Sequence, residues 1–288
     1  MSDFISDCKI GNLELENRLL LAPMLEPNDI AFRLLCKRAG CGLVYVGMTS
    51  PLSQAKFYLD DKPALQLFGN SPKGIESFMK KYDSKVSLWD FNLGCPSKLS
   101  RRLVHGAFMS GEVEMIKEIL KVMRSSTEKP VTIKIRKSDD AIEIARTAES
   151  IGVDAICIHA RTVAQGYSGE VDYDFALKVK AAVNVPIIFS GDVDENNVDD
   201  ILKDFDFVMA GRSCIGNPGF FAKFSKKKVD VGFGEYLKLA KKYRLFFRQV
   251  KYQAMNFTKG VVGGKALRIR LIGAKDVGDI EEIMGKNK

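Results

Sequence analysis

Short apolar runs alternate with helix-like segments along the first 222 residues of the chain. The segments between the runs, such as residues 112–124 and 140–151, repeat apolar residues at helical spacing and end near Gly or Pro. This alternation indicates βα units that form a parallel sheet. The predicted strands are residues 19–22, 43–46, 64–68, 86–92, 131–135, 155–159, 186–189 and 207–210. Eight such strands predict an α/β fold in which a (β/α)8, or TIM, barrel closes on itself.

A doubly wound open sheet is the alternative arrangement of βα units. Such a sheet usually carries a Gly-rich phosphate-binding turn after its first strand. Residues 22–27 read Ala-Pro-Met-Leu-Glu-Pro and contain no glycine, and the chain has no P-loop motif. The sequence therefore favours the closed barrel.

The pattern changes after residue 222. Apolar residues there recur at helical spacing, with Lys and Arg on the remaining faces. We therefore predict a catalytic barrel over residues 1–222 and a small C-terminal helical module over residues 223–288. The apolar stripe that we assign to the core of this module is Tyr236, Ala240, Tyr243, Phe247, Val250 and Ala254.

The net charge of +8 is concentrated in the C-terminal part of the chain. Residues 223–288 hold 17 Lys and Arg against 6 Asp and Glu, whereas residues 1–222 hold 27 against 30. Such asymmetry indicates a surface for a polyanion beside a nearly neutral catalytic body. A basic helical face that is merely solvated is the alternative.

Composition excludes several classes of protein. No apolar run approaches the roughly 20 residues of a membrane helix, and residues 1–10 lack the pattern of a signal peptide, so we expect a cytoplasmic protein without membrane contact.

The six cysteines form no close-set pairs of the kind that bind zinc, and we expect reduced thiols. Cys36 and Cys41 come nearest to a metal pair, but with two histidines in the chain we expect no metal. No obligate protein partner is indicated.

Candidate reactive groups lie at the predicted carboxyl ends of the strands, where barrel enzymes hold their active sites. Cys95 follows the fourth strand and stands between a glycine and a proline, which places the thiol on a turn at the barrel mouth. Lys134 and Arg136 fall on the same side of the fifth strand, facing the interior or its rim. His159 ends the sixth strand, a position that favours a site over a structural role.

Two glycine-containing turns follow the last two strands. They read Ser190-Gly191-Asp192 and Gly211-Arg212. Loops at these places in a barrel frequently bind phosphate, because glycine lets backbone N–H groups approach the oxygens. A phosphorylated cofactor is one interpretation, and tight-turn geometry alone is the other.

With these residues in place, the sequence resembles the dihydrouridine synthase family of FMN-dependent enzymes that reduce uridines in tRNA. The resemblance covers nearly the whole chain. Its most specific element is Asp90-Phe91-Asn92-Leu93-Gly94-Cys95-Pro96-Ser97, with Gly106 ten residues beyond the proline. The supporting blocks, in matching order, are Ala22-Pro23-Met24, Leu65-Gln66-Leu67-Phe68-Gly69, residues 131–136, residues 159–162 and residues 165–169.

The resemblance implies a role for each matching residue. Cys95 would be the catalytic acid, and Asn92 and Arg136 would orient the uracil ring. The residues implied in FMN binding are Pro23, Met24 and Leu25 along the ring, Gln66, Lys134 and His159 at its polar atoms, and Ser190, Gly191, Asp192, Gly211 and Arg212 at its phosphate.

The resemblance also implies the reaction. NADPH or NADH reduces FMN, the flavin N5 delivers hydride to C6 of the uracil, and Cys95 protonates C5 from the opposite face. The tRNA would be held by the basic module, for which the candidate phosphate contacts are Lys226, Lys227, Lys228, Lys241, Lys242, Arg244, Arg248, Lys259, Arg268 and Arg270.

Two features depart from the family pattern or stand outside it. Ser190 occupies a position where the family pattern has Asn, which leaves one cofactor hydrogen bond open. His105 lies in the loop after Cys95, and we interpret it as an exposed loop histidine without an assigned role. Two rival functions remain: an FMN barrel reductase of a free small molecule, similar to dihydroorotate dehydrogenase, and a non-catalytic RNA-binding barrel.

Overall fold

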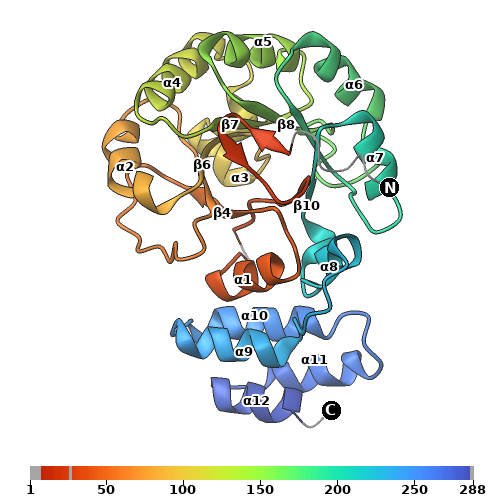
Figure 1. The fold of residues 1–288 in the computed structure, drawn as a ribbon. Coiled ribbons are helices and arrows are strands. Elements are labelled where there is room, and N and C mark those ends of the chain that lie inside the picture. Colours follow the sequence, from red (N-terminus) through yellow and green to blue (C-terminus); the bar gives the residue numbers. More distant parts are fainter. Residues whose placement is uncertain (1–7, 26–27, 286–288) are drawn as a thin grey trace.

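The computed structural model describes residues 8–25 and 28–285. Eight parallel strands close into a barrel in the order β10-β3-β4-β5-β6-β7-β8-β9 (Figure 1). These strands are β3 (Leu19–Leu21), β4 (Leu43–Thr49), β5 (Ala64–Leu67), β6 (Leu88–Leu93), β7 (Val131–Arg136), β8 (Ala155–His159), β9 (Ile187–Ser190) and β10 (Phe207–Ala210). The predicted barrel is confirmed, and every predicted strand matches an observed one to within three residues at each end.

Side-chain alternation along the strands gives the barrel two different surfaces. In β7 the apolar residues pack outward against the helices, whereas Thr132, Lys134 and Arg136 point inward. The other strands alternate in the same way. Apolar side chains fill the amino-terminal part of the interior, and they include Leu20, Tyr45, Ala64, Leu88, Ala155, Ile188 and Phe207. The polar inward residues are therefore left at the carboxyl ends of the strands.

Helices follow the strands and cover the outside of the barrel (Figure 1). They are α1 (Ile30–Arg38), α2 (Ile75–Tyr82), α4 (Val113–Ser125), α5 (Ala141–Ile151), α6 (Tyr173–Ala182) and α7 (Val198–Asp204), with short 3-10 turns at Asp83–Lys85, Gly106–Met109 and Arg212–Cys214. The short helix α3 (Lys98–Leu103) follows the loop after β6 and lies inside this ring of helices in Figure 1. The two helices predicted over residues 112–124 and 140–151 correspond to α4 and α5. In α5 the buried residues Ala141, Ile144, Ala145 and Ala148 form the stripe that faces the sheet.

A short hairpin precedes the barrel and was not predicted. Its strands are β1 (Lys9–Ile10) and β2 (Leu13–Glu14), which pair antiparallel. Ile10 is fully buried and belongs to the apolar cluster of the barrel interior, so the hairpin closes the amino-terminal end of the barrel. Three parts of the sequence discussed above lie outside the described residues: residues 1–7, the pair Glu26 and Pro27, and residues 286–288 of the predicted C-terminal module.

Five helices follow the last strand and form the lower part of the molecule in Figure 1. They are α8 (Phe220–Ser225), α9 (Phe233–Lys242), α10 (Phe247–Phe257), α11 (Gly264–Ile272) and α12 (Val277–Gly285). The boundary expected between residues 222 and 223 falls inside α8, and the division into two domains stays a prediction. Four residues of the predicted stripe are buried, but Tyr243 and Phe247 are half-buried because the chain turns between α9 and α10 at this point.

The half-buried side chain of Asp29 joins these C-terminal helices to the barrel. Asp29 caps α1 by accepting the N–H of Phe32 at 3.0 Å. Its other oxygen accepts the Gln253 amide of α10 at 2.9 Å and the Tyr236 hydroxyl of α9 at 3.3 Å. Burial raises the pKa of Asp29, and the hydrogen bonds that it accepts from Gln253 and Phe32 act in the opposite direction. One side chain therefore couples the start of α1 to two helices far away in sequence.

None of the helices formed by residues 8–25 and 28–285 has the length and apolar character required to cross a lipid bilayer. Over the same residues, no group of three or more His, Cys, Asp or Glu side chains has the arrangement of a metal site.

Candidate active site

A hydrogen-bonded chain of polar side chains runs through the middle of the barrel interior. The carboxylate of Asp90, on β6, accepts the Thr132 hydroxyl at 2.6 Å with one oxygen and the Gln66 amide N–H at 2.6 Å with the other. All three side chains are buried. Because a carboxylate only accepts, it fixes the orientation of the Gln66 amide, whose oxygen must then point toward the barrel mouth.

Asn92 continues this chain to the cysteine loop. Its amide N–H donates to the oxygen of Gln66 at 2.8 Å, and its own oxygen accepts the backbone N–H groups of Cys95 at 3.0 Å and Gly94 at 3.2 Å. The loop that holds the cysteine is thus anchored to a network inside the barrel. Asn92 lies near the mouth, and its polar atoms bind protein groups.

Cys95 differs from the other five cysteines of the chain, because it is half-buried whereas the others are buried. Close packing with Gly106 defines its position. Gly106 has φ +62°, and a Cβ atom there would lie 2.9 Å from the carbonyl oxygen and 3.1 Å from the Cβ of Cys95. The N–H of Ala107 also donates to that carbonyl oxygen at 3.1 Å. A residue with a side chain at position 106 would displace the cysteine.

Arg136 connects three segments of the mouth. Its guanidinium donates to the carbonyl oxygen of Gly94 at 2.9 Å, to that of Thr162 at 3.0 Å and to that of Gly166 at 2.8 Å. Another guanidinium nitrogen lies 3.3 Å from Nδ1 of His159. Arg136 is buried, and burial lowers its pKa. The residue was expected to face the barrel interior or its rim, and the structure places it beside the cysteine loop, which it holds.

His159 lies between two arginines. Its Nδ1 faces Arg136 and its Nε2 lies 3.3 Å from Arg161. Burial lowers the pKa of His159 to about 2, and four cations add to this effect: Lys134, Arg136, Arg161 and Arg212. The imidazole is therefore neutral at physiological pH. A neutral histidine among cations leaves a strongly positive mouth.

Asp192 is the carboxylate that faces this group of cations. It forms ion pairs with Arg161 and, at 2.6 Å, with Arg212. Gly191, just before it, has φ +119°, and a Cβ atom there would lie 2.7 Å from Cδ2 of His159. Only glycine allows the backbone after β9 to approach the histidine this closely. The cations outnumber this carboxylate, so the mouth favours an anionic ligand.

The remaining predicted residues lie around the same mouth. Ser190 pairs with His159 across the neighbouring strands β9 and β8. A Cβ atom on Gly211 would lie 3.5 Å from the Cβ of Ala22 and 4.0 Å from the sulfur of Met24, so the turn after β10 approaches the turn after β3. Of that turn, Pro23 and Met24 are half-buried and Leu25 is exposed. The structure thus brings the predicted residues to one end of the barrel.

A family model described as dihydrouridine synthase matches residues 20–275. The chain belongs to the dihydrouridine synthase family. Curated relatives extend over most of the same length. A tRNA-dihydrouridine synthase B of Pectobacterium carotovorum is 33% identical over 243 residues, which are 77% of this chain and 75% of the relative. A tRNA-dihydrouridine synthase B of Vibrio cholerae is 29% identical over 297 residues, with 87% and 92% of the two chains covered.

Solved structures similar to this dihydrouridine synthase family member share its fold at low sequence identity. A 2-naphthoyl-CoA reductase complex superposes with a TM-score of 0.60 at 13% identity, covering 78% of this chain and 52% of the other. An old yellow enzyme homologue from Zymomonas mobilis gives 0.57 at 11% identity, covering 78% and 93%. These likenesses show the barrel architecture alone.

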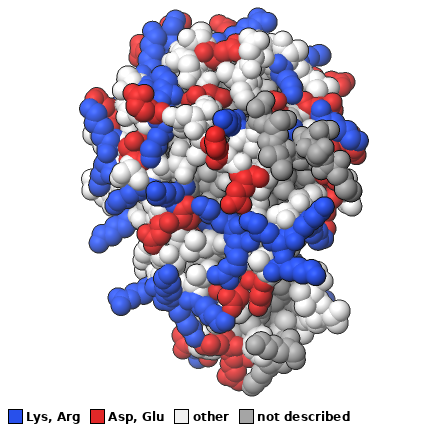
Figure 2. Space-filling view, in the orientation of Figure 1, with Lys and Arg blue, Asp and Glu red and all other residues white. Residues whose placement is uncertain are grey.

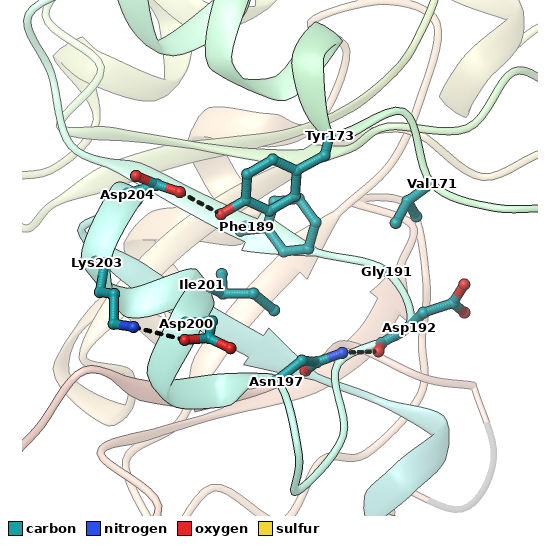
Figure 3. Close-up of a pocket in the computed structure, with 10 residues that line it drawn as sticks. All are labelled: Val171, Tyr173, Phe189, Gly191, Asp192, Asn197, Asp200, Ile201, Lys203 and Asp204. Carbon is teal, nitrogen blue, oxygen red and sulfur yellow. Dashed lines mark hydrogen bonds and ion pairs between the residues drawn. The ribbon is translucent and has the colours of Figure 1, made fainter.

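A cavity outside the barrel wall lies beside the Gly191 turn of this dihydrouridine synthase family member (Figure 3). It has a volume of about 480 Å³ and is lined by aromatic side chains and by three carboxylates, among them Asp200 and Asp204. Asp204 accepts the Tyr173 hydroxyl at 2.8 Å, and Asp200 pairs with Lys203 at 2.7 Å. Its acidic lining does not suit an anionic cofactor, in contrast to the barrel mouth.

Sequence reasoning missed three residues near the mouth. It assigned no role to Asp90. Leu88, Asp90 and Asn92 are alternate residues of β6, and this alternation indicates that all three side chains point into the barrel. Sequence reasoning also assigned no role to Arg161, which is fully buried and binds the carbonyl oxygen of Gly169 at 3.0 Å. The interpretation of His105 as an exposed loop histidine was wrong, because His105 is only 3% exposed to solvent. Loops distant in sequence cover it, and no local pattern reveals such burial.

Proposed function

We propose that this protein reduces uridines in tRNA to 5,6-dihydrouridine, with bound FMN and with NADPH or NADH as the electron donor. Membership of the dihydrouridine synthase family supports the proposal, and curated relatives carry the name tRNA-dihydrouridine synthase B. The observation that carries it is the position of Cys95, a half-buried thiol held at the mouth of a barrel that is lined by cations.

The mouth fits a flavin phosphate in its charge and its backbone. Lys134, His159 and Gln66 would hold the polar atoms of the ring, and Pro23, Met24 and Leu25 would lie along it. The phosphate would be held by Ser190, Gly191, Asp192, Gly211 and Arg212, where Gly191 permits close backbone approach. A net positive site also stabilises the negative charge that a reduced flavin carries. When bound, FMN supplies the hydride for C6 of the uracil.

Cys95 would supply the proton. Its thiol S–H transfers H⁺ to C5 of the uracil, and the sulfur is left as a thiolate that regains a proton from solvent. Asn92 and Arg136 would orient the uracil ring, and both already hold the backbone of the cysteine loop. Asn92 and Arg136 would thus hold both the thiol and the uracil. This arrangement would keep the distance between the sulfur and C5 constant.

The C-terminal helices would bind the body of the tRNA. Figure 2 shows Lys and Arg side chains gathered over the junction of the barrel and these helices. Two of these lysines form ion pairs, Lys227 with Glu16 and Lys241 with Glu281. Further exposed lysines in this region are Lys226, Lys228 and Lys242. Extruding a uridine from its stack costs a few kcal/mol, which phosphate contacts on such a surface offset.

The decisive experiment compares substrates. The purified protein should be yellow, and with NADPH or NADH it should form dihydrouridine in unmodified tRNA at a rate that falls as salt rises. Reduction of free uridine or orotate as fast as tRNA, without salt dependence, would support the small-molecule reductase and overturn the proposal. A colourless protein that binds tRNA without reducing it would support the non-catalytic alternative.

A further inference from the structure

A second cavity lies at the same end of the barrel as Cys95. Its volume is about 200 Å³, below the roughly 300–1,000 Å³ of sites for whole small molecules or cofactors. The walls come from loops that follow the consecutive strands β4, β5 and β6. The lining residues are Ser50, Pro51, Leu52, Phe68, Gly69, Asn70, Ser71, Lys73, Leu103 and His105. A cavity of this size suits one ring system.

The cavity is attached to the cysteine loop. His105 immediately precedes Gly106, the residue that packs against Cys95. The backbone N–H of His105 donates to the carbonyl oxygen of Ser100 at 3.0 Å, which fixes the histidine to α3. The cavity lining is therefore one residue away from the contact that positions the proposed acid.

His105 carries hydrogen-bonding capacity that the described protein residues leave unused. Its side chain is buried, and among those residues neither Nδ1 nor Nε2 has a hydrogen-bond partner. Burial lowers the pKa of His105, so its neutral ring offers one donor and one acceptor. Leaving both unsatisfied costs stability, and a ligand with a polar atom placed at either nitrogen would recover part of this cost.

The rest of the lining suits a nucleobase with an attached phosphate. Phe68 contacts His105 with ring centroids 4.5 Å apart, and the two rings make an aromatic wall. Leu52 and Leu103 are exposed apolar side chains at the cavity, and Lys73 supplies an exposed positive charge. Single-stranded RNA is recognised by this combination of aromatic stacking, hydrogen bonds to base edges and a nearby cation.

We propose that this cavity binds the base of a nucleotide next to the reduced uridine, and so selects the sequence around it. The proposal rests on the proposed function, since it needs an RNA substrate whose uridine reaches Cys95. The protein would then recognise two splayed nucleotides, one at the barrel mouth and one in the cavity beside Phe68, His105 and Lys73.

The test uses the FMN-loaded full chain with three variants. His105→Phe keeps an aromatic ring but removes both nitrogens, Lys73→Met removes the charge, and Lys80→Met is the matched control on the exposed face of α2, outside the cavity lining. Dihydrouridine formation is measured on tRNA transcripts in which each base flanking the reduced uridine is replaced in turn. Reduction of the flavin by NADPH or NADH is measured separately.

We expect His105→Phe and Lys73→Met to raise KM for tRNA about tenfold, the effect of losing one base contact, with kcat within about twofold of the parent. The parent should discriminate among the replaced flanking bases, and His105→Phe should lose this discrimination. Lys80→Met should behave like the parent, and flavin reduction should be unchanged in all variants.

Unchanged KM and unchanged discrimination in His105→Phe would overturn the inference while leaving the proposed function intact. A raised KM for NADPH or NADH in place of tRNA would also overturn it, and would assign the cavity to the electron donor. If the parent protein forms no dihydrouridine in any tRNA, the proposed function fails, and this inference fails with it.

Discussion

The side-chain oxygen of Asn92 accepts the backbone N–H of Cys95 at 3.0 Å. Through this bond the position of the thiol depends on the amide chain of Asn92 and Gln66 and, beyond it, on the carboxylate of Asp90. A group inside the barrel therefore sets the geometry of the loop at its mouth, and this dependence can be tested by substitution.

Replacing Asn92 should impair the transfer of the proton more than the reduction of the flavin. Asn92→Ala removes the acceptor for the Cys95 and Gly94 N–H groups, and a lost hydrogen bond of this kind costs about 1–3 kcal/mol. We expect the rate of uridine reduction to fall about 10- to 100-fold. Rapid-mixing measurements of flavin reduction by NADPH should give the parent rate, and a parallel loss of both half-reactions would contradict this reading.

Replacing Cys95 should abolish uridine reduction and spare the first half-reaction. Cys95→Ala removes the proposed proton donor and should leave the barrel interior unchanged. The matched control is Cys36→Ala, which removes a thiol buried on α1 away from the mouth. Single-turnover assays on pre-reduced enzyme separate the steps. Equal loss of flavin reduction in Cys95→Ala, or residual uridine reduction at the parent rate, would exclude the assigned role.

Asp90 should make stability depend on pH. Burial raises its pKa to about 7, whereas the unfolded chain has the ordinary carboxyl value near 3.9. Between these values the folded protein binds more protons than the unfolded chain, so the contribution of Asp90 to stability decreases as pH rises from about 4 to 7. Asp90→Asn retains donors and acceptors for Thr132 and Gln66 without titrating.

Unfolding should therefore be compared at several pH values for the parent and Asp90→Asn. The melting temperature of the variant, relative to the parent, should rise as pH increases through this interval, corresponding to a few kcal/mol at most. A difference that stays constant from pH 4.5 to 7.5 would show that Asp90 does not change its protonation there.

Asp29 should determine how firmly the C-terminal helices are held. Asp29→Ala removes the cap of α1 and the acceptor for Gln253 and Tyr236, which together should lower stability by about 2–4 kcal/mol. Asp29→Asn keeps a capping oxygen and should lose less. Thermal melts and limited proteolysis between α8 and α9 give the measurement, and equal melting temperatures for parent and Asp29→Ala would contradict the prediction.

Basic side chains of the C-terminal helices and their connecting loops should control affinity for tRNA without affecting chemistry. Lys242→Glu, Arg244→Glu and Lys259→Glu change exposed residues. Each lost phosphate contact should weaken binding and reduce the slope of log K against log salt by about 1. Filter binding at several salt concentrations tests this, with Lys121→Glu on α4 as a charge-matched control. Identical slopes for all variants would place the RNA on another surface.

The barrel and the inward-facing residues of its strands could be predicted from the sequence, because the alternation of inward and outward side chains along a strand is a local pattern. In β7 a period of two alone separates Ile133, which packs outward, from Lys134, which points inward. The hairpin β1–β2 has two residues in each strand, too few to show a period. The exposure of His105 was predicted wrongly for another reason. The loops after β4 and β5 bury it, and these loops are distant in sequence.

The contacts of Arg136 have a consequence for substrate entry. Its guanidinium binds carbonyl groups of the loop after β6 and of the segment after β8, and it also touches His159. If either segment swings outward alone, it must break one or more charge-assisted hydrogen bonds to Arg136. A tRNA substrate would therefore meet an opening whose outline is already set, and we expect the deformation needed for a fit to fall on the nucleic acid.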